Sequence, residues 1–367
     1  MKPKRKIKIY YGLLPLACLY RLGVSIRNWM FDRGILRSQS FPLPVICVGN
    51  ISVGGTGKTP HTEYLIRLLR KDYQVAVLSR GYKRKSEGFV LATPETSAEQ
   101  IGDEPYQMAH KFPDIYVAVD RDRCHGIRQL TDGHTAPGVI VLDDAFQHRY
   151  VKPGLTILLI DYNRPIHLDR MLPAGRLREP ESGKKRADII IVSKCPAQLS
   201  EAEQLALRSE IAPLPCQQLY FTTLAYGKLQ PLFTAEPEKR LEKIRKDEHI
   251  LLVTGIASPA AIIDKLSAYT QFIMPLTFPD HHDFDATDMK RITEAFKKLP
   301  ADRRFIVTTE KDAARLITHP LLDETLKPSI YVLPVEVAFL NEEEHLFNQN
   351  IIEYVRKNSR NSSFSKS

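Results

Sequence analysis

This 367-residue chain has few cysteines, and none of them is close to another in the sequence. The five follow no paired spacing and stand at Cys18, Cys47, Cys124, Cys195 and Cys216. Such a pattern argues against a disulfide framework or a zinc site, and it is typical of a reducing compartment. Internal repeats and low-complexity segments are also absent, and the 43% hydrophobic and 26% charged residues are ordinary for globular proteins. We therefore expect a globular chain long enough for two domains.

Long hydrophobic runs are missing as well. The most apolar stretch, residues 9–20, spans about 12 residues and contains Pro15, whereas a helix needs about 20 apolar residues to cross a bilayer. A secretory leader would need a small-x-small cleavage site, and residues 19–21 do not provide one. We expect an interfacial helix that continues through Trp29 and Phe31. The alternative is a solvated basic tail followed by a helix packed on the domain.

Positive charge is concentrated at the two ends of the chain. Within a net charge of +9, residues 1–40 hold nine Lys or Arg and one Asp, and residues 356–367 hold four Lys or Arg and no acid. The part between them is slightly acidic, unlike a nucleic-acid-binding protein with a basic folded face, so we expect no nucleic-acid partner. Basic residues beside an apolar stretch indicate attraction to an anionic membrane surface.

Residues 45–60, VICVGNISVGGTGKTP, have the pattern of a phosphate-binding loop between a strand and a helix. Four small residues form the turn: Gly54, Gly55, Thr56 and Gly57. They let backbone N–H groups converge on phosphate oxygens, and the helix at about 60–69 points its positive N-terminal end at the same place. Lys58 is expected to reach the β- and γ-phosphates and the Thr59 hydroxyl to hold Mg²⁺. Ser52 stands where the motif usually begins with glycine. The sequence predicts a nucleoside triphosphate site.

After this loop, short apolar runs alternate with helical stretches. Runs such as 75–78, 139–142 and 189–192 are rich in β-branched residues, as expected for parallel strands buried on both faces. The alternation predicts an α/β fold, a P-loop NTPase-like, doubly wound and mostly parallel sheet, with its ligand at the carboxyl ends of the strands. A second series of the same kind, between residues 250 and 333, predicts a second, smaller α/β domain.

The composition shifts suggest five parts. They are a basic and apolar N-terminal segment (1–40), a P-loop domain (41–216), a two-stranded linker (217–235), a second α/β domain (236–356) and a disordered basic tail (357–367).

Acidic residues follow the apolar run 139–142 and precede a predicted helix. Asp143 and Asp144 end a buried strand downstream of the P-loop, where such enzymes hold Mg²⁺ beside the Thr hydroxyl. Asp103 and Glu104, followed by a proline, make a good helix start, so Asp103 is either an N-terminal cap or a general base. The two roles are compatible.

Two further polar segments are candidates for the site. Residues 279–283, Pro-Asp-His-His-Asp, lack metal-ligand spacing, and a histidine that assists a carboxylate is weighed against a solvated loop. Residues 173–180 form a basic loop in which Arg176 and Arg178 are candidates for phosphate contacts and Glu179 for a metal ligand. Surface salt bridges are the alternative for this loop.

These motifs, taken in order, resemble the tetraacyldisaccharide 4′-kinase family of lipid A biosynthesis. The matching stretches are VGNISVGGTGKTP, SRGYKRK, GDEP, VLDDAFQHR, LPAGRLREP, VTGIASP, FPDHH and TTEKDA, which together span residues 45–313. The resemblance implies two P-loop-like α/β domains joined by a β-ribbon, and an N-terminal segment that docks on the inner membrane. The family also tolerates a residue other than glycine at the position of Ser52.

The resemblance also implies roles for single residues. Lys58 and Thr59 would bind phosphate and Mg²⁺, and Asp143 and Asp144 match the Walker B acids. Asp103 matches the proposed catalytic base. Two more residues match with assisting roles: His281, which would help the base, and Glu179, an acid linked to the metal.

The implied reaction is transfer of the γ-phosphate of ATP to the 4′-hydroxyl of a tetraacylated glucosamine disaccharide 1-phosphate. ATP and Mg²⁺ would be the cofactors, and the glycolipid and the anionic membrane surface the partners. We expect no obligate protein partner. The expected location is the cytoplasmic face of the bacterial inner membrane, peripheral or monotopic.

Two other functions fit a P-loop. A switch or partition-type ATPase would act on a protein partner and hydrolyse ATP without an acceptor. A soluble small-molecule kinase would need no basic, apolar N-terminal segment.

Overall fold

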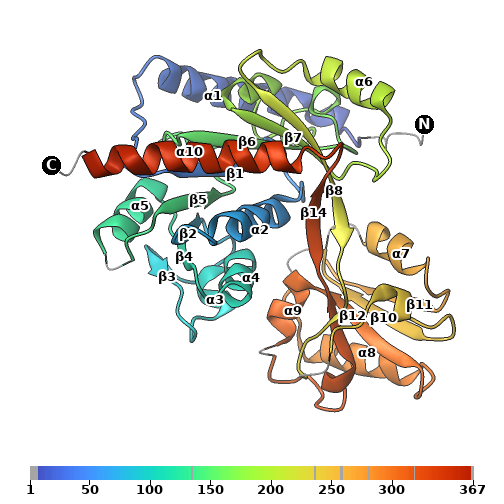
Figure 1. The fold of residues 1–367 in the computed structure, drawn as a ribbon. Coiled ribbons are helices and arrows are strands. Elements are labelled where there is room, and N and C mark those ends of the chain that lie inside the picture. Colours follow the sequence, from blue (N-terminus) through green and yellow to red (C-terminus); the bar gives the residue numbers. More distant parts are fainter. Residues whose placement is uncertain are drawn as a thin grey trace. The chain divides into compact units, whose positions relative to one another are not determined.

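The computed structural model describes residues 7–133, 135–234, 237–256, 259–279, 282–317 and 319–364. The chain forms two compact units: Met1–Leu224 together with Val337–Ser367, and Ala225–Glu336. Each unit has its own sheet and hydrophobic core (Figure 1).

The first unit is built on a nine-stranded sheet. Its strands lie in the order β14-β8-β7-β6-β1-β5-β2-β4-β3. Their bounds are β1 Val45–Gly49, β2 Val75–Ser79, β3 Val90–Leu91, β4 Tyr116–Val119, β5 Val139–Asp143, β6 Leu155–Asp161, β7 Ile189–Ser193, β8 Gln218–Tyr226 and β14 Val335–Phe339. The central strand β1 is parallel to both neighbours, β5 and β6, whereas β3 is antiparallel to β4. Every residue of β1, β2, β5 and β7 is buried, which explains their unbroken apolar runs.

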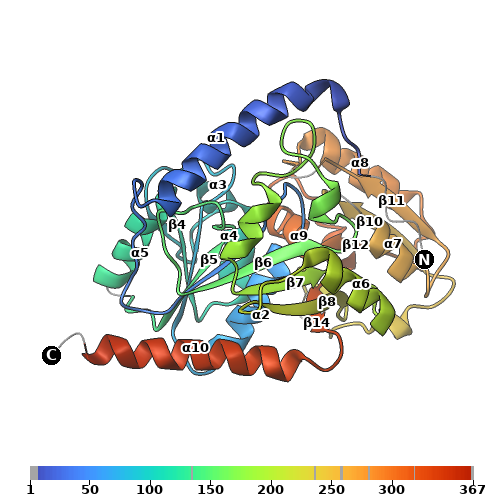
Figure 2. The same cartoon turned by 90° about the horizontal axis from the view of Figure 1, so that it is seen from above.

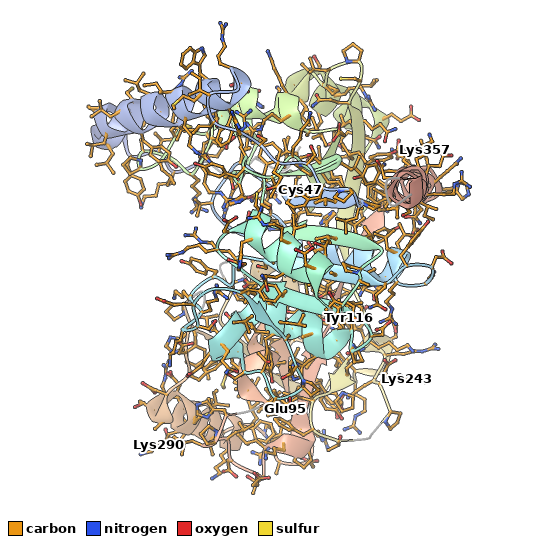
Figure 3. All side chains as sticks on the ribbon, turned by 90° about the vertical axis from the view of Figure 1, so that its left-hand side faces the viewer. Cys47, Glu95, Tyr116, Lys243, Lys290 and Lys357 are labelled. Carbon is orange, nitrogen blue, oxygen red and sulfur yellow. The ribbon has the colours of Figure 1, made fainter. Side chains whose placement is uncertain are left out.

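Helices cover both faces of this sheet. On one face lie α2 (Lys58–Leu69), α4 (Asp103–Lys111) and α10 (Glu344–Phe364), and on the other α5 (Arg123–Asp132) and α6 (Glu201–Ile211). Side chains of β1 alternate between the two, since Ile46 packs with the α2 side and Cys47 with the α5 side. Figure 2 shows α10 on one side of the sheet and α1 (Leu14–Asp32) on the other. Cys47 is labelled within the interior of this unit in Figure 3.

The C-terminal helix α10 differs from the domain division expected from the sequence. Residues 337–364 belong to the first unit instead of the second domain and a disordered tail, and α10 runs to Phe364. The physical reason is an apolar stripe at i, i+4 and i+8: Phe347, Ile351 and Val355 are fully buried in the core beside α2.

The N-terminal helix α1 follows a short 3-10 turn, η1 (Tyr11–Leu13). Ala17 and Phe31 are its buried residues, and Phe31 packs edge-on against Tyr150. Leu14 and Val24 are partly buried against the same core as Ala17, whereas several other apolar side chains are exposed, namely Leu16, Leu19, Leu22, Ile26 and Trp29. Among the described residues, no helix combines the length and the apolar composition needed to cross a membrane.

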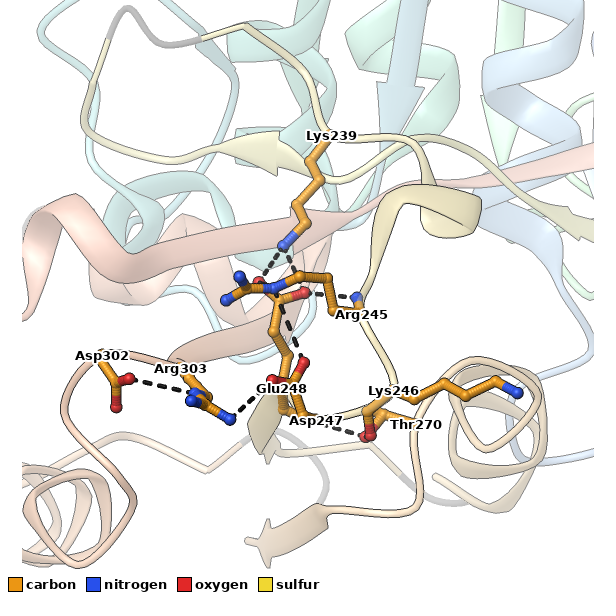
Figure 4. A network of polar contacts seen from close by, with 8 residues as sticks. All are labelled: Lys239, Arg245, Lys246, Asp247, Glu248, Thr270, Asp302 and Arg303. Carbon is orange, nitrogen blue, oxygen red and sulfur yellow. Dashed lines mark hydrogen bonds and ion pairs between the residues drawn. The ribbon is translucent and has the colours of Figure 1, made fainter.

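The second unit has a five-stranded sheet in the order β11-β10-β12-β13-β9. Its strands are β9 Gln230–Pro231, β10 His249–Thr254, β11 Ile273–Thr277, β12 Arg304–Thr309 and β13 Ile330–Leu333, and its helices are α7 Ala260–Leu266, α8 Ala286–Lys297 and α9 Glu310–Leu316. A polar network fixes the start of β10 (Figure 4). In it Lys239 Nζ lies 2.8 Å from Glu248 Oε1, and Arg303 Nη1 lies 2.8 Å from Asp247 Oδ2.

The connection between the units also differs from the linker expected at 217–235. The chain passes from the first unit to the second along β8 and returns along β14, and these two strands are neighbours in the larger sheet. The segment expected to pair locally, around residues 229–233, contributes β9 to the second sheet instead. The two strands of the linker were expected within residues 217–235, but β14, the neighbour of β8, begins over a hundred residues further along the chain.

Candidate nucleotide and metal site

The P-loop follows the central strand β1 and ends where α2 begins. Gly54 and Gly57 have φ values of 110° and 83°, a backbone region that favours glycine. Gly57 is the N-terminal cap residue of α2, and no side chain of the described residues caps this helix end. The first N–H groups of α2 therefore face the loop and suit an anion.

Several side chains hold the loop from behind. Asn50 Nδ2 donates to Thr56 Oγ1 at 2.7 Å, and Ser193 Oγ at the end of β7 donates to Thr56 O at 2.7 Å. Lys194 Nζ also donates to Gly55 O. The basic loop adds a backbone bond from Val53 N to Arg176 O at 2.7 Å. The loop is thus fixed in shape before any ligand binds.

His61, one turn into α2, supports the loop from inside the protein. Its Nδ1 lies 2.7 Å from Gly57 O and its Nε2 lies 3.1 Å from Thr222 Oγ1 on β8. Burial lowers the pKa of His61 to about 4, so the ring is neutral at pH 7. Sequence analysis missed this residue. Its only signal was a polar residue on the apolar side of a predicted helix.

Lys58 and the second Walker acid lie together. Lys58 Nζ is 3.7 Å from Asp144 Oδ2, and Arg178 Nη2 is 2.7 Å from Asp144 Oδ1. Although burial raises the pKa of Asp144, the charges of Lys58 and Arg178 outweigh it and leave this pKa below the ordinary value. Asp144 itself has φ 47°, a left-handed turn directly after β5.

Asp143 has a different environment. It is 4% exposed and accepts a hydrogen bond from Thr62 Oγ1 at 3.0 Å. Burial, with the neighbouring charge of Asp144, raises the pKa of Asp143 to about 6. Two carboxylates therefore lie together at the end of β5, on the side of α2 that carries Thr62. Hard oxygen donors of this kind fit a cation such as Mg²⁺, and Thr59, three residues before Thr62, adds a hydroxyl.

Asp103 is the first residue of α4 and is 9% exposed. It follows Gly102, whose φ is 90° and whose added Cβ would lie 2.9 Å from the carbonyl oxygen of Tyr82. This close approach places the start of α4 against the loop that leaves the carboxyl end of β2. The charge of Glu104 acts on Asp143. The α4 start therefore faces the same end of the sheet as the Walker acids.

Glu179 and the two histidines of residues 279–283 are the remaining candidates from the sequence. Glu179 is 1% exposed, and its Oε2 lies 2.6 Å from Arg186 Nη2, whereas its buried Oε1 has no hydrogen-bond partner in the described part of the chain. His281 lies outside the described residues. Its neighbour His282 stacks on Phe278 and bonds Asp288 through Nε2 at 2.6 Å, within the second unit.

Arg123 is a buried cation near the acids. It is 4% exposed, its charge acts on Asp144 and Asp143, and its Nη1 donates to Arg121 O at 3.1 Å. Sequence analysis missed Arg123, because no local pattern marks it as buried.

Comparison with known proteins agrees with the geometry. The family model described as tetraacyldisaccharide-1-P 4′-kinase matches residues 9–355. A tetraacyldisaccharide 4′-kinase of Phocaeicola vulgatus is 63% identical over 98% of this chain and 99% of its own, and one of Bacteroides thetaiotaomicron is 54% identical over 98% and 97%. LpxK from Aquifex aeolicus, solved in complex with ATP, is 30% identical, covers 94% of this chain and 98% of its own, and superposes with a TM-score of 0.72. The α/β, P-loop NTPase-like fold predicted from the sequence is thereby confirmed. With the P-loop, the paired acids Asp143 and Asp144 at the end of β5 and a family match along nearly the whole chain, this protein belongs to the tetraacyldisaccharide-1-P 4′-kinase family.

Proposed function

We propose that this protein transfers the γ-phosphate of ATP to the 4′-hydroxyl of a tetraacylated glucosamine disaccharide 1-phosphate. One observation carries the proposal: Lys58 and Asp144 lie 3.7 Å apart at a P-loop within a chain that the family model matches from residue 9 to residue 355. The relatives' shared name supplies the acceptor.

The loop and α2 would hold the triphosphate. Phosphoryl transfer has a loose transition state, so positioning and charge neutralisation provide most of the catalysis. The N–H groups at the start of α2 and the Lys58 ammonium would neutralise β- and γ-phosphate oxygens. Thr59, Asp143 and Asp144 would hold Mg²⁺, with Glu179 as a further candidate. When bound, Mg²⁺ neutralises charge on the phosphate oxygens.

Lys58 would exchange one partner for another during binding. In the structure the Lys58 ammonium forms an ion pair with Asp144, which Arg178 also contacts. An arriving phosphate competes for the ammonium group, while Arg178 stays to neutralise Asp144. The shared carboxylate thus keeps Lys58 near the loop without an unpaired charge.

Asp103 would accept the proton of the sugar hydroxyl, assisted by His281. Support comes from its place at the start of α4, where Glu104 acts on Asp143. Base catalysis of this kind contributes about 10²–10⁴-fold.

The N-terminal helix would bring the enzyme to its substrate. Leu19 and Leu22 are 66% and 57% exposed, and basic residues precede the helix. Apolar side chains beside basic residues favour an anionic interface. We propose peripheral or monotopic association with the cytoplasmic face of the bacterial inner membrane.

A direct test is to incubate the protein with labelled ATP, Mg²⁺ and the acylated disaccharide 1-phosphate in detergent. Label should enter the glycolipid, with little ATP hydrolysis when the acceptor is omitted. Asp103→Asn should lower turnover by about 10²-fold or more while nucleotide affinity is kept, and Glu99→Gln, an exposed acid of the preceding helix α3 (Ala98–Ile101), serves as the control. Acceptor-independent hydrolysis at the same rate would favour a switch ATPase instead.

A further inference from the structure

Three potential metal ligands, two at the start of α5 and one in the loop after β5, lie close together. Asp122, Cys124 and His148 each offer one ligand atom, and these atoms lie within 4.8 Å of one another. They lie outside the P-loop and the Walker acids. No two of them have the spacing by which cysteine-rich zinc sites are recognised in a sequence.

The topology of the sheet explains their meeting. Asp122 and Cys124 stand where β4 ends and α5 begins, and His148 stands in the loop that leaves β5. Both strands are parallel members of one sheet, so these loops emerge at the same edge. Asp122 is the N-terminal cap of α5, and its Oδ1 accepts from Cys124 N at 2.8 Å and His125 N at 3.2 Å. The cap fixes Asp122 beside Cys124.

Each of the three groups keeps a ligand atom available. His148 Nε2 is buried and has no hydrogen-bond partner among the residues that the structure describes, which is costly for an imidazole nitrogen. The Cys124 thiol is buried and in no disulfide. Asp122 is exposed, and among the residues that the structure describes its side chain accepts hydrogen bonds only at Oδ1. The neighbouring His125 is already engaged, with Nδ1 2.6 Å from Asp120 Oδ2.

We propose that Asp122, Cys124 and His148 form a zinc site that clasps the loop after β5 to the start of α5. A thiolate, an imidazole and a carboxylate are the donors that Zn²⁺ uses in tetrahedral sites, and the exposed side of Asp122 leaves a fourth position for water. Tetrahedral bonds of about 2.0–2.3 Å put neighbouring ligand atoms about 3.3–3.8 Å apart. The present separations of up to 4.8 Å must therefore shorten by up to about 1–1.5 Å when the ion binds.

Charge also permits the ion. Arg123, Arg27 and Arg80 act on His148, and Arg128 acts on Cys124, so several cations lie nearby. A carboxylate and a thiolate together cancel the two charges of Zn²⁺, and the loaded site is neutral toward these arginines. A magnesium ion, which prefers oxygen ligands, gains nothing from the thiol or the imidazole. The site therefore selects a softer ion than the one proposed at the Walker acids.

Cobalt spectroscopy of the full-length protein tests the site. After chelator treatment, Co²⁺ is added in a thiol-free buffer with Mg²⁺ in excess to occupy oxygen-rich sites. We expect one equivalent of Co²⁺ to produce a thiolate-to-cobalt charge-transfer band that one equivalent of Zn²⁺ removes. Cys124→Ser should abolish the band, and His148→Gln should weaken Co²⁺ binding at least tenfold.

Cys216→Ser is the matched control, because Cys216 is an exposed thiol of the same unit, and it should leave the band unchanged. Thermal melts of each variant without metal establish folding. A band that persists in Cys124→Ser, the absence of a band in the wild type, or equal binding by His148→Gln would each overturn the proposal. If Cys124→Ser does not fold, two results decide the test. They are the charge-transfer band of the wild type and the weaker binding of Co²⁺ by His148→Gln.

Discussion

The substitution Asp143→Asn should stabilise the ligand-free protein while it removes activity. Asp143 is 4% exposed, and its pKa is raised from 3.8 to about 6, chiefly by burial and then by Asp144. A carboxyl group with a raised pKa in the folded state binds protons more tightly there than when unfolded. Its contribution to the free energy of unfolding therefore falls as pH rises from about 4 to about 6. At higher pH the buried charge destabilises the folded state by the full amount.

The size of the effect follows from the two pKa values. The difference between 3.8 and about 6 corresponds to about 3 kcal/mol, and we expect a gain of about 1–3 kcal/mol at pH 7.5. The amide oxygen of Asn can still accept the hydrogen bond from Thr62 Oγ1, so no buried hydroxyl is left unpaired. In a unit of this size the gain raises the melting temperature by about 2–6 °C.

The assay is thermal unfolding of wild type and variant without Mg²⁺ or nucleotide, from pH 4 to pH 8. The gain should be present at pH 7.5 and become small toward pH 4, close to the unfolded-state pKa of 3.8, below which Asp143 is protonated in both states. Added Mg²⁺ and ATP should stabilise the wild type more than the variant, since a ligand stabilises the state that binds it. Turnover should fall by at least about 10²-fold, the order expected when a charge-stabilising group is lost.

Asp161→Asn is the matched control. Asp161 is also a buried acid at the end of a parallel strand, but its Oδ2 lies 3.2 Å from Lys194 Nζ. Removing this charge should leave stability unchanged or lower it. Equal stabilisation by both substitutions, or a gain for Asp143→Asn that does not depend on pH, would refute the reasoning.

Three further predictions concern the loop and the N-terminal helix. Lys58→Ala should weaken ATP binding and turnover together, because the lysine would contact phosphate in both the ground and transition states. Calorimetry measures the binding and steady-state kinetics the turnover. Full activity of the variant would contradict the assignment of the loop. His61 has a pKa of about 4 against an ordinary 6.5, so the stability it contributes is present above pH 6.5 and lost as pH falls toward 4; melts of His61→Asn should show a weaker pH dependence in this window than wild type. The double substitution Leu19→Asp with Leu22→Asp should reduce binding to anionic vesicles at least tenfold in a flotation assay with an unchanged melting temperature, since both side chains are exposed. Leu205→Asp, an exposed leucine on α6, is its control, and equal losses from both helices would argue against a specific α1 surface.

The sequence alone determined the features that depend on local chemistry. The glycines and Lys58 identify a P-loop because the motif needs a turn between a strand and a helix, and the structure has that turn at 50–57. Asp143 and Asp144 could be placed at the end of a strand because an unbroken apolar run precedes them. The α/β class followed from the alternation of such runs with helices. The role of His281 stays a prediction.

The tertiary structure decided what depends on partners distant in the chain. The apolar stripe of α10 was visible in the sequence, but whether it covered the first or the second sheet was not, because either would bury Phe347 and Ile351 equally well. The return of the chain along β14 beside β8 was hidden for the same reason. The support of Gly57 by His61, the burial of Arg123 and the meeting of Cys124 with His148 arise only when separate loops reach one edge of the sheet. Local pattern determines which elements form, whereas burial and charge in three dimensions determine which side chains act together.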